Sequence, residues 1–171
     1  GEENKGWTYA KFLLSHERSG IARIAASKAR LDYLRQIAAR RRVGGRLLAD
    51  DPDFRREVAE AEIQLSALEF TELRYLMAAE SGREPGNEAN MLKIRGTDMQ
   101  QHISELLMRA VGYYALPHIP EAREYGYNET PVGPLEAGSL APVYFNLRKT
   151  SIYGGSNEIQ HNIIAKMVLG L

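Results

Sequence analysis

Two places near opposite ends of the sequence contain residues that could do chemistry. The first is Glu17, followed by Arg18, inside an otherwise apolar helical pattern. Burial raises the pKa of a carboxylate, and a carboxylate held in this way can act as the base for a carbon acid. The second is a turn opened by Gly154 and Gly155, after which Ser156 could cap a helix. Such a helix start presents free backbone N–H groups and a positive dipole end to an electron-rich ligand.

Glu17 stands in a row of positions spaced alternately by four and three residues, which is the spacing of the inward face of a helix. The other members of this row are small or apolar: Leu13, Gly20, Ile24, Ser27, Leu31, Leu34 and Ala38. We therefore expect the face to be buried, with Gly20 leaving space beside the carboxylate. The alternative is a glutamate at the edge of the row that reaches solvent and pairs with a cation of another helix.

Helical periodicity dominates the chain, and capping and breaking residues set the expected limits of each helix. Glycines end the first segment, and an aspartate followed by proline begins the second. A stretch rich in proline, glycine and tyrosine, residues 115–138, is expected to be a long irregular loop. The expected helices run from about Trp7 to Arg42 (before Gly44 and Gly45), from Asp51 and Pro52 to Ser81, from Asn87 to Tyr114, from Ser139 to Ser151, and from Ser156 to Leu169.

Long helices joined by short loops must run antiparallel to bury their apolar faces. The predicted fold is therefore all-α, an antiparallel up-down bundle of about four long helices plus a short C-terminal helix. Its length of 171 residues fits one domain, residues 1–171.

The composition argues against several classes of function. Lysine plus arginine and aspartate plus glutamate both number 22, so the zero net charge gives no electrostatic case for binding nucleic acid or an anionic membrane. There are no cysteines, which is compatible with a cytoplasmic location, and no apolar run long enough to span a bilayer. The histidines, His16, His102, His118 and His161, lack metal-ligand spacing with carboxylates, so no metal site is expected. The polar start without methionine indicates a piece of a longer chain.

Both ends of the sequence resemble the C-terminal helical domain of the acyl-CoA dehydrogenases. The stretch from Gly1 to Trp7, followed by the Glu17-Arg18 pair, resembles the family's entry from its β-domain into this domain. The tail resembles the family's closing turn beside the flavin, although Gly154 replaces the catalytic glutamate of its best-known form. Long-chain and isovaleryl members keep that glutamate on the first helix and have glycine or alanine in the tail. This sequence shows both halves of the exchange.

The resemblance implies FAD-dependent α,β-dehydrogenation of an acyl-CoA to the trans-2-enoyl-CoA, with Glu17 as the base and Arg18 organising its surroundings. Gly154 and Gly155 would line the substrate cavity. The resemblance also implies roles next to the cofactor, for Ser156 beside the flavin, Glu158 on the adenine side, and Arg40 at the pyrophosphate of a neighbouring subunit's FAD. Residues 1–6 would be a linker from a preceding β-domain. The implied partners are an electron-transfer flavoprotein and further copies of the chain in a dimer or tetramer.

One motif departs from the family. Many members have a Gln-x-x-Gly-Gly-x-Gly loop that meets the partner's flavin, and this chain has Val111-Gly112-Tyr113-Tyr114-Ala115-Leu116-Pro117 in its place. Two alternatives therefore stay open. The chain could belong to an impaired partner subunit of a heteromeric dehydrogenase, or it could be a helical interaction module without a flavin.

Overall fold

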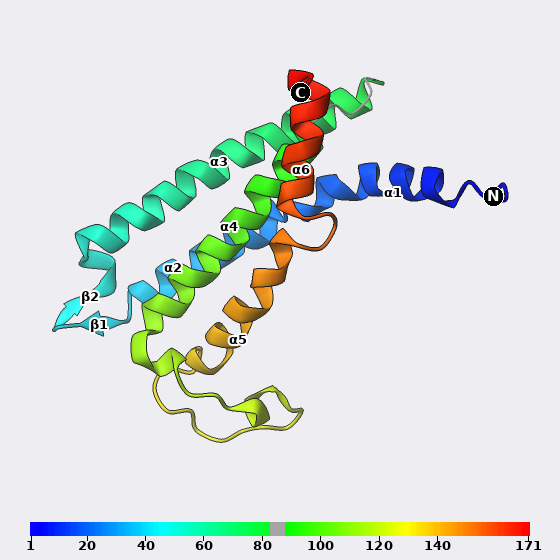
Figure 1. The fold of residues 1–171 in the computed structure, drawn as a ribbon. Helices are drawn as coiled ribbons and strands as arrows, with labels where there is room; N and C mark the ends of the chain where they lie inside the picture. The colour runs from blue at the N-terminus through cyan, green and yellow to red at the C-terminus, as the bar shows by residue number, and fades with distance from the viewer. Residues whose placement is uncertain (83–87) are drawn as a thin grey trace.

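The computed structural model describes residues 1–82 and 88–171, apart from the side chains of residues 14–19, 21 and 123. Figure 1 shows a bundle of helices with one small hairpin. The helices are α1 (Gly6–Ile21), α2 (Ile24–Ala38), α3 (Pro52–Glu80), α4 (Glu88–Val111), α5 (Ala137–Leu147) and α6 (Asn157–Ile164). Shorter elements are the strands β1 (Arg42–Val43) and β2 (Arg46–Leu47), the 3₁₀ turns η1 (Leu48–Asp50), η2 (Gly112–Ala115), η3 (Pro120–Arg123) and η4 (Arg148–Ser151), and the π turn η5 (Ala165–Leu169).

Helix α4 is the centre of the fold. It contacts α1, α2, α3, α5 and α6, and α2, α3 and α4 run alternately up and down (Figure 1). Fully buried leucines and isoleucines from these three helices form the core, among them Leu34, Leu65, Leu92, Ile103 and Leu106. The predicted all-α, up-down bundle is therefore confirmed. None of the described helices is long and apolar enough to cross a membrane.

The predicted helix from Trp7 to Arg42 is divided into α1 and α2. The break lies at Ala22 and Arg23, and Arg23 has left-handed backbone angles, φ 49° and ψ 44°. The break lies where the chain packs closely against α4, because a Cβ added at Gly96 would lie only 2.4 Å from Cα of Ala22. Gly20, where the sequence has its weakest helix former, stays helical.

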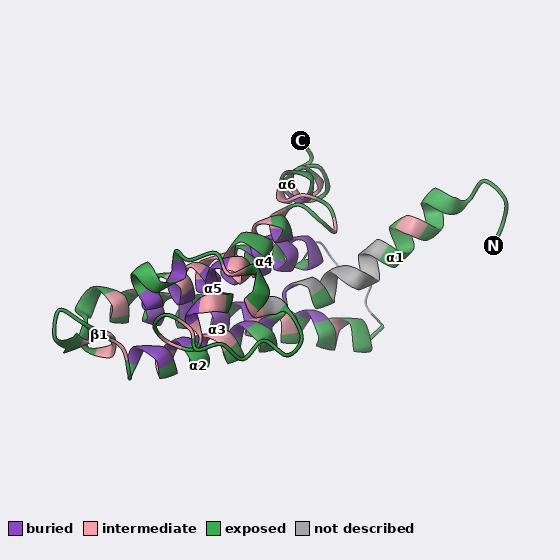
Figure 2. Ribbon diagram, turned by 90° about the horizontal axis from the view of Figure 1, so that it is seen from below, coloured by how far each residue is buried: buried purple, intermediate pink, exposed green. Residues whose placement is uncertain are grey.

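The expected buried face follows the same division. In α2 it is confirmed, since Ile24, Ser27, Leu31, Leu34 and Ala38 are all buried. In α1 it is wrong for Leu13, which is 65% exposed, and for Gly20, which is exposed. Figure 2 shows the reason, because α1 leads away from the bundle and its described residues are mostly exposed.

The ends of the other helices show where capping and breaking residues predicted the helix limits correctly and where they did not. Asp51 caps α3 as predicted, and its Oδ1 accepts a hydrogen bond of 2.8 Å from the Phe54 N–H. Gly44 and Gly45, with φ of +57° and +84°, instead form the two-residue turn of the β1–β2 hairpin, so α2 ends before Arg42. The predicted start of α4 at Asn87 lies outside the described residues. The expected fourth helix is shorter, because residues 148–151 form η4.

Candidate functional site

The start of α6 is built as the sequence predicts. The Ser156 hydroxyl accepts a hydrogen bond of 3.4 Å from the Ile159 N–H, which is the expected cap. Gly154 and Gly155 both have left-handed φ, +69° and +88°. Behind the turn, the fully buried Gln160 donates through Nε2 to the Gly155 carbonyl at 3.3 Å. The glycines and the glutamine together fix the path of the chain into α6.

Gly155→Ala is expected to destabilise the fold by about 2–3 kcal/mol. Alanine would strain the left-handed backbone at this position, and its Cβ would lie 2.5 Å from Gln160 Nε2. Gly45→Ala is the matched control, since Gly45 has a similar φ of +84° but no described atom within 4 Å. The control should lose about 1 kcal/mol. Chemical denaturation of the wild type and the two variants measures both losses of stability. If the two variants lose equally, the contact with Gln160 does not contribute to the cost at Gly155.

Glu158 folds back onto the same helix start. Its pKa lies below the ordinary value because the carboxylate accepts hydrogen bonds from its own backbone N–H and from Ser156, with smaller attraction from Lys93 and His161. A carboxylate with a lowered folded pKa stabilises the folded state at neutral pH, and that contribution is lost as pH falls through the lowered pKa. The side chain is exposed, so a ligand can reach it.

Asn157, the first residue of α6, is bound by α4. Its Oδ1 accepts from Lys93 Nζ at 2.7 Å and lies 3.3 Å from the Thr97 hydroxyl. Its Nδ2 donates to Asp98 Oδ1 at 3.2 Å. Lys93 itself is fully buried, at 0% exposure. Both ends of the Asn157 amide are thus held by residues of one helix, α4.

A second clamp holds the segment before the glycine turn. The Gln101 side-chain amide lies 3.2–3.3 Å from acceptors at the end of α5 and in η4, namely the carbonyls of Leu147 and Arg148 and the hydroxyls of Thr150 and Ser151. Arg148 returns to α4 by donating to the Gln101 carbonyl at 2.9 Å and to the Ser104 hydroxyl at 3.1 Å. Helix α4 therefore anchors the chain on both sides of the turn.

Glu17 and Arg18 lie in the range of α1, but their side chains fall outside the described residues, so their role stays a prediction. The structure does place their helix, α1, relative to α4 and α6. At Gly96, α4 packs against Ala22, one residue past the end of α1, and at Lys93 and Thr97 it binds the first residue of α6. Three residues within one stretch of α4, residues 93–97, thus connect the end of α1 with the start of α6; Figure 1 shows α4 beside both helices.

Arg40 does not join this group. It follows the C-terminal end of α2, and α2 is about 20 Å long, so Arg40 lies far from the α1–α2 break. Its side chain is 66% exposed, and its guanidinium lies 3.5 Å from Glu136 Oε1. Burial and the charge of Glu136 raise the pKa of the adjacent Tyr33 phenol. Arg40 and the start of α6 therefore do not belong to one site within a single chain.

Lys93, which binds the first residue of α6, was not indicated by the motifs. It occupies a row of α4 with the same four-and-three spacing as the row of Glu17. The members of this row are all buried: Ala89, Lys93, Gly96, Gln100, Ile103, Leu107 and Ala110. A lysine in such a row was the available signal, since lysine is almost never fully buried without a partner.

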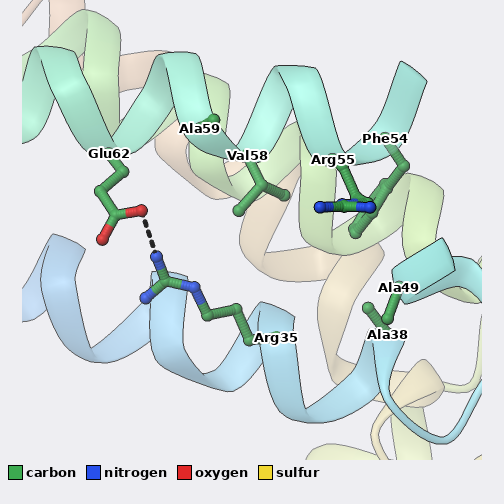
Figure 3. Close-up of a pocket in the computed structure, with 8 residues that line it drawn as sticks. All are labelled: Arg35, Ala38, Ala49, Phe54, Arg55, Val58, Ala59 and Glu62. Atoms are coloured by element: carbon green, nitrogen blue, oxygen red, sulfur yellow. Dashed lines mark ion pairs between the residues drawn. The ribbon is translucent and has the colours of Figure 1, made fainter. Parts of the chain in front are cut away.

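Two further kinds of site are relevant in the described part of the chain, a metal site and a pocket. No group of three or more potential metal ligands occurs among the described residues. Figure 3 shows a pocket of about 290 Å³ between α2 and α3, where Arg35 and Glu62 form an ion pair of 2.6 Å. None of the predicted site residues lines this pocket.

Comparison with known proteins gives a consistent result. The family described as "Acyl-CoA dehydrogenase, C-terminal domain" matches residues 4–169. Acyl-CoA dehydrogenase IpdE1 of Mycobacterium tuberculosis is 29% identical over 175 residues, which cover 100% of this chain and 40% of that protein. The mitochondrial long-chain specific acyl-CoA dehydrogenase of Mus musculus is 26% identical, covering 99% of this chain and 36% of that protein.

Solved structures agree. A chain of the ChsE4-ChsE5 complex from Mycobacterium tuberculosis superimposes with a TM-score of 0.77 and 27% identity, covering 100% of this chain and 42% of that one. The chain thus spans about 40% of the length of the relatives it matches.

Proposed function

Because the chain belongs to the acyl-CoA dehydrogenase family, whose C-terminal domain it matches over residues 4–169, we propose that its protein is an FAD-dependent acyl-CoA dehydrogenase. The reaction would convert an acyl-CoA to the trans-2-enoyl-CoA. The observation that carries the proposal is the glycine turn and capped start of α6, held by α4 at the point where α4 also meets the end of α1.

In this reaction Glu17 takes the α-proton of the thioester onto its carboxylate, and FAD, when bound, supplies the acceptor for the β-hydride. The tail of this chain supports the assignment of the base to α1. Gly154 has a φ of +69°, which a glutamate would adopt only with strain. Without a side chain, it would leave space for the acyl group. Arg18 would organise the surroundings of Glu17, and Gly155 would line the cavity beside Gly154.

The groups at the start of α6 fit a flavin nucleotide. Ser156 and the first N–H groups of α6 offer polar contacts, and the exposed Ile152 and Tyr153 before the turn offer apolar surface to a ring system. The buried Oε1 of Gln160 has no hydrogen-bond donor among the described residues, which leaves one acceptor beside the turn. Glu158 would lie on the adenine side, and Arg40 would bind the pyrophosphate of a neighbouring subunit's FAD in a dimer or tetramer. An electron-transfer flavoprotein would accept the electrons.

One observation favours a second candidate, an impaired partner subunit of a heteromeric dehydrogenase. Residues 112–115, where many family members have the glycine-rich loop that meets a flavin, form η2. Tyr114 in this turn lies under the Arg41 guanidinium, 5.0 Å from ring centroid to Cζ. The structural relative from the ChsE4-ChsE5 complex is also part of an assembly of two different chains.

The deciding experiment purifies the whole gene product and records its visible absorption. An active dehydrogenase should contain yellow flavin that bleaches when an acyl-CoA is added without oxygen. A panel of straight, branched and ring-bearing acyl-CoAs covers the substrate class. Flavin that no acyl-CoA bleaches would favour the impaired subunit, and a protein that neither retains nor takes up FAD would overturn the proposal.

A further inference from the structure

Lys93 is the most unusual side chain of the described core. It is fully buried in the second turn of α4 and belongs to a row of small, apolar and amide residues. Burial lowers the pKa of its ammonium, although the charges of Asp98 and Glu158 oppose this effect. Neither carboxylate lies within 4.0 Å of the ammonium, so Lys93 forms no direct ion pair with a described residue.

The hydrogen bond from Lys93 instead goes to an amide. Its Nζ lies 2.7 Å from Asn157 Oδ1, a distance typical of a strong charge-assisted hydrogen bond. The amide is also held by Thr97 and Asp98, so its orientation is fixed by three residues of α4. Asn157 lies between Ser156 and Glu158, the two residues proposed to contact the cofactor.

We propose that Lys93 is a positioning residue of the candidate cofactor site, which fixes the start of α6 through Asn157. A buried ammonium without a direct counter-charge is costly for stability, and an apolar side chain of similar length would fill the space without that cost. The lysine therefore contributes orientation rather than packing. Because one turn of α4 also contacts Ala22, the same residues set the distance between the start of α6 and the end of α1.

The test uses the whole gene product and four variants. Lys93→Met removes the charge and keeps the length, and Asn157→Ala removes the bound amide. The double variant tests whether the two residues act through each other. Lys28→Met is the matched control, because Lys28 pairs with Glu69 between α2 and α3 and does not contact α6.

The first measurement is backbone amide hydrogen exchange, which does not depend on a flavin. Lys93→Met and Asn157→Ala should each speed exchange in the first turn of α6 at least about tenfold, equivalent to about 1.4 kcal/mol. The double variant should be no faster than Lys93→Met, and Lys28→Met should leave α6 unchanged. If exchange instead rises equally throughout α3 and α4, or does not change in α6, Lys93 is a packing residue and the inference is wrong.

The second measurement is the dissociation constant of FAD and rests on the proposed function. Lys93→Met and Asn157→Ala should weaken FAD binding by a similar factor, about tenfold or more, while Lys28→Met should not. Weakened exchange protection with unchanged FAD affinity would overturn the link to the cofactor. If the wild-type protein takes up no FAD, the proposed function fails, while amide exchange still decides whether Lys93 fixes α6. If Lys93→Met does not fold, Lys93→Leu takes its place in both measurements, because Asn157→Ala also removes the contacts with Thr97 and Asp98.

Discussion

Glu17→Gln is expected to lower the rate of flavin reduction by acyl-CoA in the whole gene product about 10²–10⁴-fold. The amide cannot accept the α-proton, and Gly154 offers no replacement base from the tail. FAD should remain bound, because the residues proposed to hold it, Ser156, Glu158 and Arg40, are unchanged. Anaerobic stopped-flow absorbance after mixing with substrate measures the rate.

Glu60→Gln is the control for this experiment, since the Glu60 side chain is 59% exposed on α3 and lies outside the proposed site. It should reduce its flavin at the wild-type rate. A Glu17→Gln protein that does the same would show that the base lies elsewhere. Loss of flavin from Glu17→Gln would indicate that the residue supports the fold or the cofactor instead.

Local signals in the sequence predicted the features that depend on a few neighbouring residues. The aspartate-proline start of α3 and the serine cap of α6 are of this kind, because a side-chain oxygen and the N–H three residues later suffice to form each cap. The bundle was also predictable, since apolar periodicity and short connections leave few ways to bury the long helices.

Features set by distant residues were not predictable in the same way. The break at Arg23 lies beside Ala22, whose backbone packs against Gly96, more than seventy positions later. A pair of glycines such as Gly44 and Gly45 can either end a helix or turn a hairpin. The pairing of the two flanking strands, β1 with β2, shows that here they turn a hairpin. The role of Lys93 depends on Asn157 in the last helix.

Gly96→Ala is expected to destabilise the chain by about 2–3 kcal/mol or more, although alanine favours a helix by about 1 kcal/mol over glycine. The added Cβ would lie 2.4 Å from Cα and 2.9 Å from Cβ of Ala22. Neither is the end of a flexible side chain, so α4 and the α1–α2 junction would have to separate. Ala22 is buried at this junction, and the loss of its packing adds to the cost.

Gly138→Ala is the matched control, because Gly138 also lies in a helix, α5, and no described atom would meet its Cβ within 4 Å. It should be neutral or stabilising by up to about 1 kcal/mol in chemical denaturation. In the whole gene product Gly96→Ala should also slow flavin reduction, since moving α4 from Ala22 shifts the helix of Glu17 relative to the start of α6. If Gly96→Ala proves as stable as Gly138→Ala, the backbones do not cross as closely as described, and the proposed connection through α4 fails.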